Sequence, residues 1–97
     1  MQFLIIACDG QDAAERRLAL RDKHLAVANQ LRAAGHLLYG VATLDGKGQP
    51  NGSMEVVQFG SRADLDRWLQ QEPYVTGQVW AKVDVTPCRV GPMFATR

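Results

Sequence analysis

The sequence predicts an α+β protein with a ferredoxin-like fold, in which an antiparallel sheet carries both of its helices on one face. The length of 97 residues fits one domain, residues 1–97. The strand and helix signals follow one another as β-α-β-β-α-β, which is the pattern of the split β-α-β fold. Both faces of the first two strands are apolar, so a second layer is expected on the face that the helices leave open.

Four segments have the composition of strands, being short, apolar and rich in β-branched or aromatic residues. These segments are residues 2–8, 36–44, 53–59 and 78–86. Residues 45–52, with the sequence DGKGQPNG, predict a polar turn between the second and third of them. In the fourth strand the set expected to be buried is Val79, Ala81, Val83 and Val85, and the alternating exposed set is Trp80, Lys82 and Asp84.

The first helix is expected over about residues 12–34. Asp12 followed three residues later by Glu15 resembles a capping box at its start. Gly35 is a typical residue just after a helix end. The adjacent charges at residues 21–22 are a candidate position for a kink or a break in this helix.

The second helix is expected over about residues 62–71. Ser61 and Asp64 have the spacing of an N-terminal cap. The helix must end before Pro73, because the residue that precedes a proline disfavours the α region.

The strand side chains divide between two faces, since successive residues of a strand point to opposite sides. In the first strand one set is Phe3, Ile5 and Ala7, and the other is Leu4, Ile6 and Cys8. In the second strand, Leu37, Tyr39 and Val41 oppose Leu38, Gly40 and Ala42. Two helices cover only one face, and the other would leave an apolar patch larger than a monomer normally exposes. We therefore expect a homodimer in which the two sheets pack face to face.

Two ionisable residues fall in the apolar faces of the two helices. His24 lies at the centre of an apolar stripe that consists of Leu20, Val27, Leu31 and Ala34. Glu72 lies seven residues after Leu65 and four after Trp68, on the buried side of the second helix end. Because a buried charge is costly unless it is paired, we expect His24 and Glu72 to meet as a general acid/base pair. The alternative is a core histidine bonded to the backbone, with Glu72 turned out to water.

Three more polar residues are candidates for holding the polar groups of a substrate. Ser53 opens the third strand, where a solvated turn serine is the alternative. Arg21 lies three residues before His24 on the flank of the stripe, where a solvated helix charge is the alternative. Tyr74 follows Glu72 closely and can bring its hydroxyl near the same pocket.

The composition argues against several classes of protein. The 11 basic and 10 acidic residues give a net charge of +1 and a pI near 7.8, which argues against a nucleic-acid partner and against a basic membrane-surface protein. No apolar run approaches the ~18 residues of a membrane span, and the start lacks the basic region of a signal peptide. A cytoplasmic protein is therefore expected.

The sequence also lacks the motifs of the common cofactor sites. It has no GxGxxG, no P-loop, no nucleophile elbow and no HExxH. One histidine with one carboxylate is too few for a zinc site, and Cys8 and Cys88 are too few for a disulfide scaffold. No cofactor and no metal are therefore expected.

Three parts of the sequence together resemble the YCII-related (YciI-like) family. They are residues 18–41, LALRDKHLAVANQLRAAGHLLYGV, with Arg21, His24 and Gly35; Gly52-Ser53 at the start of the third strand; and Glu72-Pro73-Tyr74 after the second helix. The resemblance extends from Met1 to about Pro92.

The resemblance implies a ferredoxin-like dimeric α+β barrel with an active site around a His and Asp pair. One relative acts as a dehydrochlorinase on a chlorinated hydroxyquinol, and the fold resembles that of muconolactone isomerases. His24, Ser53 and Tyr74 match the family's residues by position. Glu72 departs from the family's usual Asp, since it keeps the charge but reaches one methylene further.

Three functions of different classes remain compatible with these residues. The first is a cofactor-independent isomerase or lyase that acts on a small cyclic or aromatic substrate. In it His24 moves a proton, Glu72 orients His24, and Arg21, Ser53 and Tyr74 bind the substrate. The second is a ligand-binding or regulatory module that uses the same pocket without chemistry. The third is an interaction domain whose sheet face is the whole function.

Overall fold

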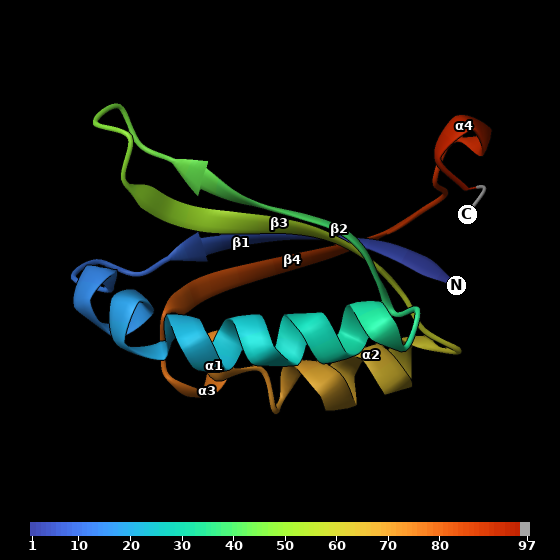
Figure 1. Ribbon diagram of the computed structural model, residues 1–97, viewed down its shortest axis with the longest axis horizontal. Helices are drawn as coiled ribbons and strands as arrows, with labels where there is room; N and C mark the ends of the chain where they lie inside the picture. Colours follow the sequence, from blue (N-terminus) through green and yellow to red (C-terminus); the bar gives the residue numbers. More distant parts are fainter. Residues whose placement is uncertain (96–97) are drawn as a thin grey trace.

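The computed structural model describes residues 1–95, and Figure 1 shows an antiparallel sheet with helices along one of its faces. The strands lie in the order β2, β3, β1, β4, with the bounds Leu37–Leu44, Pro50–Gln58, Gln2–Asp9 and Trp80–Cys88. The helices on the covered face are α1 (Ala14–Ala33), α2 (Arg62–Leu69) and the short α3 (Pro73–Thr76). A last short helix, α4 (Pro92–Ala95), lies away from these three (Figure 1).

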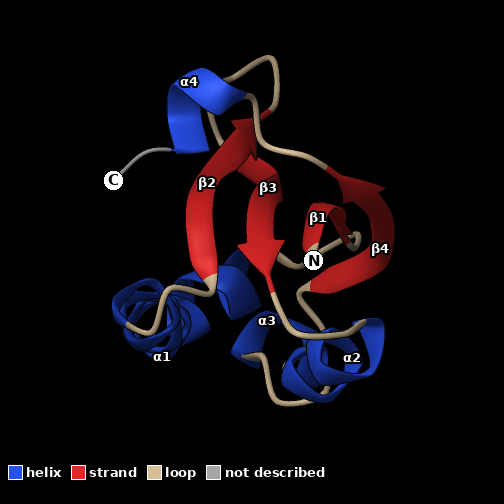
Figure 2. Cartoon of the chain, turned by 90° about the vertical axis from the view of Figure 1, so that its right-hand side faces the viewer, coloured by secondary structure: helices blue, strands red, loops and turns tan. Residues whose placement is uncertain are grey.

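This arrangement confirms the predicted ferredoxin-like α+β fold. Both neighbours of β1 run antiparallel to it, and β2 runs antiparallel to β3. The two predicted helices share one face of the sheet, as Figure 2 also shows. The fold is the one that each subunit of a dimeric α+β barrel adopts.

The core lies between the sheet and the helices. Phe3 and Ile5 of β1 point toward the helices and are buried, as the predicted alternation requires. Val57 of β3 and Leu65 of α2 complete the same buried cluster. Burying a side chain of this size contributes about 1.5–3 kcal/mol, so this cluster holds α2 against the sheet.

The opposite face of the sheet is apolar and exposed. Ile6 at its centre is 45% exposed, and Tyr39 and Val41 on β2 are 64% and 39% exposed. The first strand is therefore apolar on both faces, with one face buried under the helices and the other open.

A bulge in β2 changes the alternation that the sequence predicted for this strand. The pairing of β2 with β3 shifts between Leu37 and Tyr39, so that Leu38 is the extra residue. Leu37 pairs with Val57 and packs on the core, whereas Tyr39 pairs with Val56 and is exposed. Placing Leu37 and Tyr39 on one face was therefore wrong.

The strand β4 begins and ends two residues later than predicted. A second bulge determines which of its side chains face the helices. Cys8 pairs with Lys82, but Asp9 pairs with Trp80, so that Ala81 is the extra residue. Trp80 is consequently buried and Ala81 exposed, the reverse of the prediction. The remaining members of the expected set are buried or pack on the core: Val79, Val83 and Val85.

The start of α1 also differs from the prediction. The helix begins at Ala14, and Ala13, at the N-cap position before it, makes no side-chain hydrogen bond to the first turn. Asp12 cannot act as the predicted cap, because it has a left-handed φ of 60° in the turn before the helix. The helix runs through residues 21–22 without a break, and Gly35, at φ 83°, follows its end as expected.

The apolar stripe of α1 is only half-buried. Leu20, Val27 and Leu31 are half-buried with His24 among them, whereas Ala34 is exposed after the last turn of the helix. No residue of α1 is fully buried, because a cavity separates part of this helix from the sheet.

The bounds of α2 and β3 differ from the prediction by a few residues. Ser61 caps α2 as expected, since its Oγ accepts the Asp64 N–H at 3.1 Å, but the helix ends at Leu69. The strand β3 begins three residues early, because its ladder with β2 continues to the pair of Leu44 and Pro50.

Replacing Val83 with Asp should lower the free energy of unfolding by about 3 kcal/mol or more, because it places an unpaired charge against both core clusters. Val83→Ala is the matched control, since it removes only packing and should cost about 1 kcal/mol. Urea unfolding measures both. Equal losses in the two variants would contradict the placement of this side chain on the covered face.

Candidate functional site

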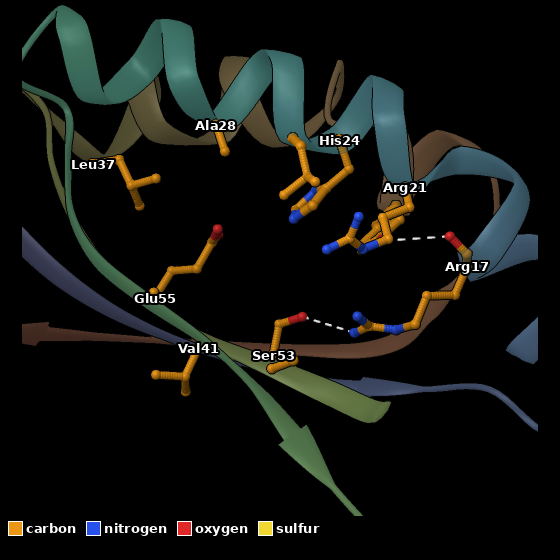
Figure 3. Close-up of a pocket in the computed structure, with 12 residues that line it drawn as sticks. Arg17, Arg21, His24, Ala28, Leu37, Val41, Ser53 and Glu55 are labelled. Carbon is orange, nitrogen blue, oxygen red and sulfur yellow. Dashed lines mark hydrogen bonds between the residues drawn. The ribbon is translucent and has the colours of Figure 1, made fainter. Parts of the chain in front are cut away.

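A cavity of about 270 Å³ lies between α1 and the sheet, and Figure 3 shows its lining. Side chains of α1 form one side and the strands β2 and β3 form the other, and Tyr74 at the start of α3 completes the lining next to α1. The polar side chains that line it are Arg17, Arg21, His24, Ser53, Glu55 and Tyr74.

His24 and Glu72 are in direct contact at this cavity. The Nδ1 atom of His24 lies 2.6 Å from Oε1 of Glu72. The second carboxylate oxygen of Glu72 accepts the backbone N–H of Tyr74 at 2.9 Å. Glu72 is only 1% exposed, and each of its two oxygens has a hydrogen-bond partner in the protein, as a buried polar group requires.

Glu72 reaches this position by a different local structure from the one predicted. It does not end α2 but lies three residues beyond it, as the N-cap of α3. Pro73 follows at the first turn of α3 and disfavours the α region for the residue before it. Glu72 accordingly has an extended backbone, with φ −69° and ψ 126°, and its side chain turns back into the core.

The contact with Glu72 assigns different roles to the two nitrogens of the His24 ring. A carboxylate accepts hydrogen bonds, so Nδ1 carries the proton that it donates to Glu72. The other nitrogen, Nε2, is then the ring atom that can accept or donate a proton at the cavity. Figure 3 shows the His24 side chain directed into the cavity.

Two aromatic rings hold the imidazole in place. Tyr74 stacks on it with the ring centroids 3.9 Å apart, and Trp80 meets it edge-on at 6.0 Å. The Tyr74 hydroxyl donates to the carbonyl oxygen of Arg17 at 3.4 Å, and burial raises the pKa of this hydroxyl. Tyr74 therefore lines the cavity as expected, but its ring positions His24 while its hydroxyl proton is used by the backbone.

Arg17 of α1, which the sequence did not single out as a site residue, is a structural centre of the site. Its guanidinium binds both carboxylate oxygens of Asp9, at 2.7 and 3.2 Å, and lies over the Tyr74 ring. It also donates to Ser53 Oγ at 2.9 Å. Its position seven residues, or two helical turns, before His24 is the sequence signal that could have revealed it.

Ser53 is buried at the cavity, so the solvated turn alternative does not hold for it. Its Oγ accepts one hydrogen bond from Arg17 and another from Trp80 Nε1 at 3.3 Å. A hydroxyl oxygen accepts two bonds and donates one. The hydroxyl proton of Ser53 is therefore left to donate to a molecule in the cavity.

Arg21 also lines the cavity, one turn after Arg17. It is exposed, and within residues 1–95 its guanidinium makes no hydrogen bond or ion pair. A guanidinium without a partner at the edge of a cavity is suited to bind a carboxylate or another oxyanion.

Glu55 is a further cavity residue that the sequence reasoning missed. It is 5% exposed, and its Oε1 has no hydrogen-bond partner in the described part of the chain. Burial raises the pKa of Glu55 to about 7. The charge of His24 lowers this pKa by a smaller amount, and the charge of Glu72 raises it. The period of two along β3 places Glu55 on the same face as Ser53, so the strand pattern could have identified it.

Metal-binding clusters and membrane-spanning helices are both absent from residues 1–95. No group of three or more His, Cys, Asp or Glu side chains in this range could hold a metal ion. No helix in the same range has both the length and the apolar character needed to cross a membrane.

Comparison of the sequence with known families and proteins gives a consistent result. Residues 1–89 match the YCII-related domain. An uncharacterised protein of Haemophilus influenzae is 34% identical over 93 residues, which cover 90% of this chain and 95% of the relative. Protein YciI of Escherichia coli is 32% identical over 93 residues, with the same coverage of both chains.

Comparison with solved structures supports the fold. A 5-chloro-2-hydroxyhydroquinone dehydrochlorinase of Burkholderia phenoliruptrix, in complex with 2,5-dihydroxybenzoquinone, superposes with a TM-score of 0.86. It is 21% identical, and the match covers 96% of this chain and 98% of that one. An antibiotic biosynthesis monooxygenase has a TM-score of 0.54 at 15% identity, with 94% and 98% of the chains covered. At these identities the likeness shows a common fold.

Replacing Glu55 with Gln should stabilise the protein at pH 8 by about 2–3 kcal/mol and have little effect near pH 4.5. The folded chain holds a proton on Glu55 up to about pH 7, whereas the unfolded chain releases it near 4.5. The stability contributed by the protonated carboxyl is thus full below pH 4.5 and is lost as the pH rises through 7.

Urea unfolding at pH 4.5 and pH 8 checks this expectation. Glu15→Gln, at an exposed glutamate of the first turn of α1, is the matched control and should not stabilise the protein at pH 8. A Glu55→Gln variant that differs from the wild type equally at both pH values would contradict it.

Proposed function

The chain belongs to the YCII-related domain family, and on that premise we propose that it is a cofactor-independent enzyme that moves protons on a small cyclic, oxygen-bearing substrate. The observation that carries this proposal is the contact of 2.6 Å between His24 and the buried Glu72 at the edge of a cavity. A histidine oriented by a buried carboxylate is a recurrent arrangement for general acid/base catalysis.

Each polar residue has a role in this proposal. His24 Nε2 accepts a proton from the substrate and returns it at another atom or to water. Glu72 orients the ring and stabilises the imidazolium that forms. Arg21 and Ser53 bind substrate oxygens, the first through its unpaired guanidinium and the second through its free hydroxyl proton. Tyr74 holds the imidazole through ring stacking.

The size of the cavity limits the substrate. A volume of about 270 Å³ is at the lower end of small-molecule sites and suits a single substituted ring. The dehydrochlorinase of similar fold was solved with such a ring, 2,5-dihydroxybenzoquinone, which makes this compound a reasonable probe. The proposed chemistry is an isomerisation or an elimination of HX, in which a base removes a proton.

We expect the wild-type protein to bind 2,5-dihydroxybenzoquinone and to turn over 5-chloro-2-hydroxyhydroquinone. His24→Gln should lower kcat by about 10²–10⁴-fold, because it removes the proton-transfer group. Glu72→Gln should lower kcat by about 10²–10⁴-fold, because an amide no longer fixes the productive ring tautomer. Chloride release and absorbance of the quinone measure turnover.

His36→Gln is the matched control, since it changes a histidine outside the cavity. Unchanged turnover in His24→Gln would contradict the proposed role of His24. Binding of the probe without turnover would contradict an enzyme of this type and favour the alternative, a ligand-binding or regulatory module that uses the same pocket. No binding at all would contradict both.

We also propose that a second copy of the chain covers the open face of the sheet. Its exposed apolar residues include Ile6 on the central strand β1 and Tyr39 and Val41 on β2. Covering this face would remove an apolar surface of the kind that monomers rarely expose. The cytoplasmic location expected from the sequence stays a prediction.

Sedimentation equilibrium should give a mass of about twice 10.7 kDa for the wild type at micromolar concentration. Ile6→Asp should shift the mass to that of the monomer, because it buries a charge at the centre of the interface. A wild-type protein that stays monomeric would contradict the proposal, and so would a fully dimeric Ile6→Asp variant.

A further inference from the structure

Glu55 is a carboxyl group of the cavity whose side chain the protein leaves incompletely bonded. Its Oε1 is buried without a hydrogen-bond partner among residues 1–95. The other carboxylates nearby are satisfied, Asp9 by Arg17 and Glu72 by His24 and a backbone N–H. A buried polar atom without a partner destabilises the folded protein, so its presence calls for an explanation.

The position of Glu55 directs it at the occupant of the cavity. It rises from β3 on the sheet side and points toward α1, as Figure 3 shows. Next to it on β2 is Gly40, where a Cβ atom would lie 3.7 Å from Glu55 Cγ. The absence of a side chain at Gly40 keeps space open beside the carboxyl group.

The charged and titratable groups around Glu55 come from α1, the start of α3 and β1. They are Arg17, Arg21 and His24 of α1, Glu72 and Tyr74 at the start of α3, and Asp9 of β1, while β2 contributes only the apolar Leu37, Gly40, Val41 and Ala42. Arg17 is taken up by Asp9 and Ser53, and Glu72 by His24. Arg21 and Glu55 are therefore the two charged side chains of the cavity without a protein partner in the described chain. They are available to a ligand together with His24 Nε2 and the Ser53 hydroxyl proton.

We propose that Glu55 contacts the ligand directly as a protonated carboxyl, donating a hydrogen bond to a ligand oxygen, and that the pocket thereby selects rings with acceptor oxygens on two opposite sides. One ligand oxygen accepts a hydrogen bond from Glu55 on the sheet side of the cavity, and the opposite oxygen is bound by Arg21 and Ser53. Hydroxyquinones and cyclic hydroxyketones have this arrangement. The inference rests on the proposed function, since it assigns a ligand class to the same pocket.

The protonated form follows from the chemistry of the contact. A carbonyl or oxyanion oxygen can only accept a hydrogen bond, and it would repel an ionised carboxylate. Burial already raises the pKa of Glu55 to about 7, so little free energy is needed to keep the proton at neutral pH. Binding of an anionic ring should therefore raise this pKa further.

Titration of 2,5-dihydroxybenzoquinone into the wild type and into Glu55→Gln between pH 5.5 and pH 8.5 tests the inference. Above pH 7, the ratio of the wild-type Kd to the Kd of Glu55→Gln should rise by about tenfold for each pH unit. The reason is that the wild type must take up a proton on Glu55 when it binds the probe, whereas the variant need not. The amide of glutamine keeps a donor at every pH, so the variant should bind about 30-fold more tightly than the wild type at pH 8.5, which lies about 1.5 units above the pKa of Glu55. Glu15→Gln is the control and should follow the wild type.

Parallel pH profiles for the wild type and Glu55→Gln would overturn the inference while leaving the proposed function intact. Absence of binding by the wild type would overturn the proposed function and the inference with it. A second measurement needs no variant: the side-chain carboxyl carbon of Glu55, followed by NMR in the wild type, should titrate at higher pH when the probe is bound. An unchanged titration would overturn the inference.

Discussion

The buried carboxylate of Glu72 is the group on which the rest of the site depends. It is 1% exposed, and a charge in that position is tolerated only because one oxygen meets His24 and the other meets the backbone N–H of Tyr74. These contacts join α1 to the segment that leads into α3, which is 48 residues further along the chain. The need to pair one charge thereby fixes the helix, the turn and the orientation of the imidazole together.

The polar groups around the cavity fall into two sets. Arg17 binds both Asp9 and Ser53 and thereby holds α1 against the strands β1 and β3. Arg21 and Glu55 have no such bonds within the described chain, and both line the cavity. A rigid, internally bonded frame that leaves one cation and one carboxyl group available is prepared for a small polar occupant, and little ordering is needed when that occupant binds.

The order of the elements and the faces of the first strand were predictable, because they depend on local patterns along the chain. The meeting of His24 and Glu72 was also predictable, from their positions on apolar helix faces taken together with the family resemblance, although the helix assigned to Glu72 was wrong. The burial of Trp80 was not predictable, because it results from a bulge that depends on the pairing of β1 with β4. Glu55 could have been predicted as a cavity residue, because the alternation along β3 places it on the same face as Ser53. Arg17 could not be predicted as a structural centre, because its partners lie on the strands β1 and β3.

The central claim is that Glu72 holds His24 with its proton on Nδ1 and leaves Nε2 for chemistry. The most direct measurement is the ¹⁵N NMR spectrum of the His24 ring in the wild type, at a pH where the ring is neutral. The structure predicts a protonated Nδ1 and an unprotonated Nε2. A neutral ring with its proton on Nε2 would contradict the account, because Glu72 would then have no donor in His24 and the proposed catalytic nitrogen would already be protonated.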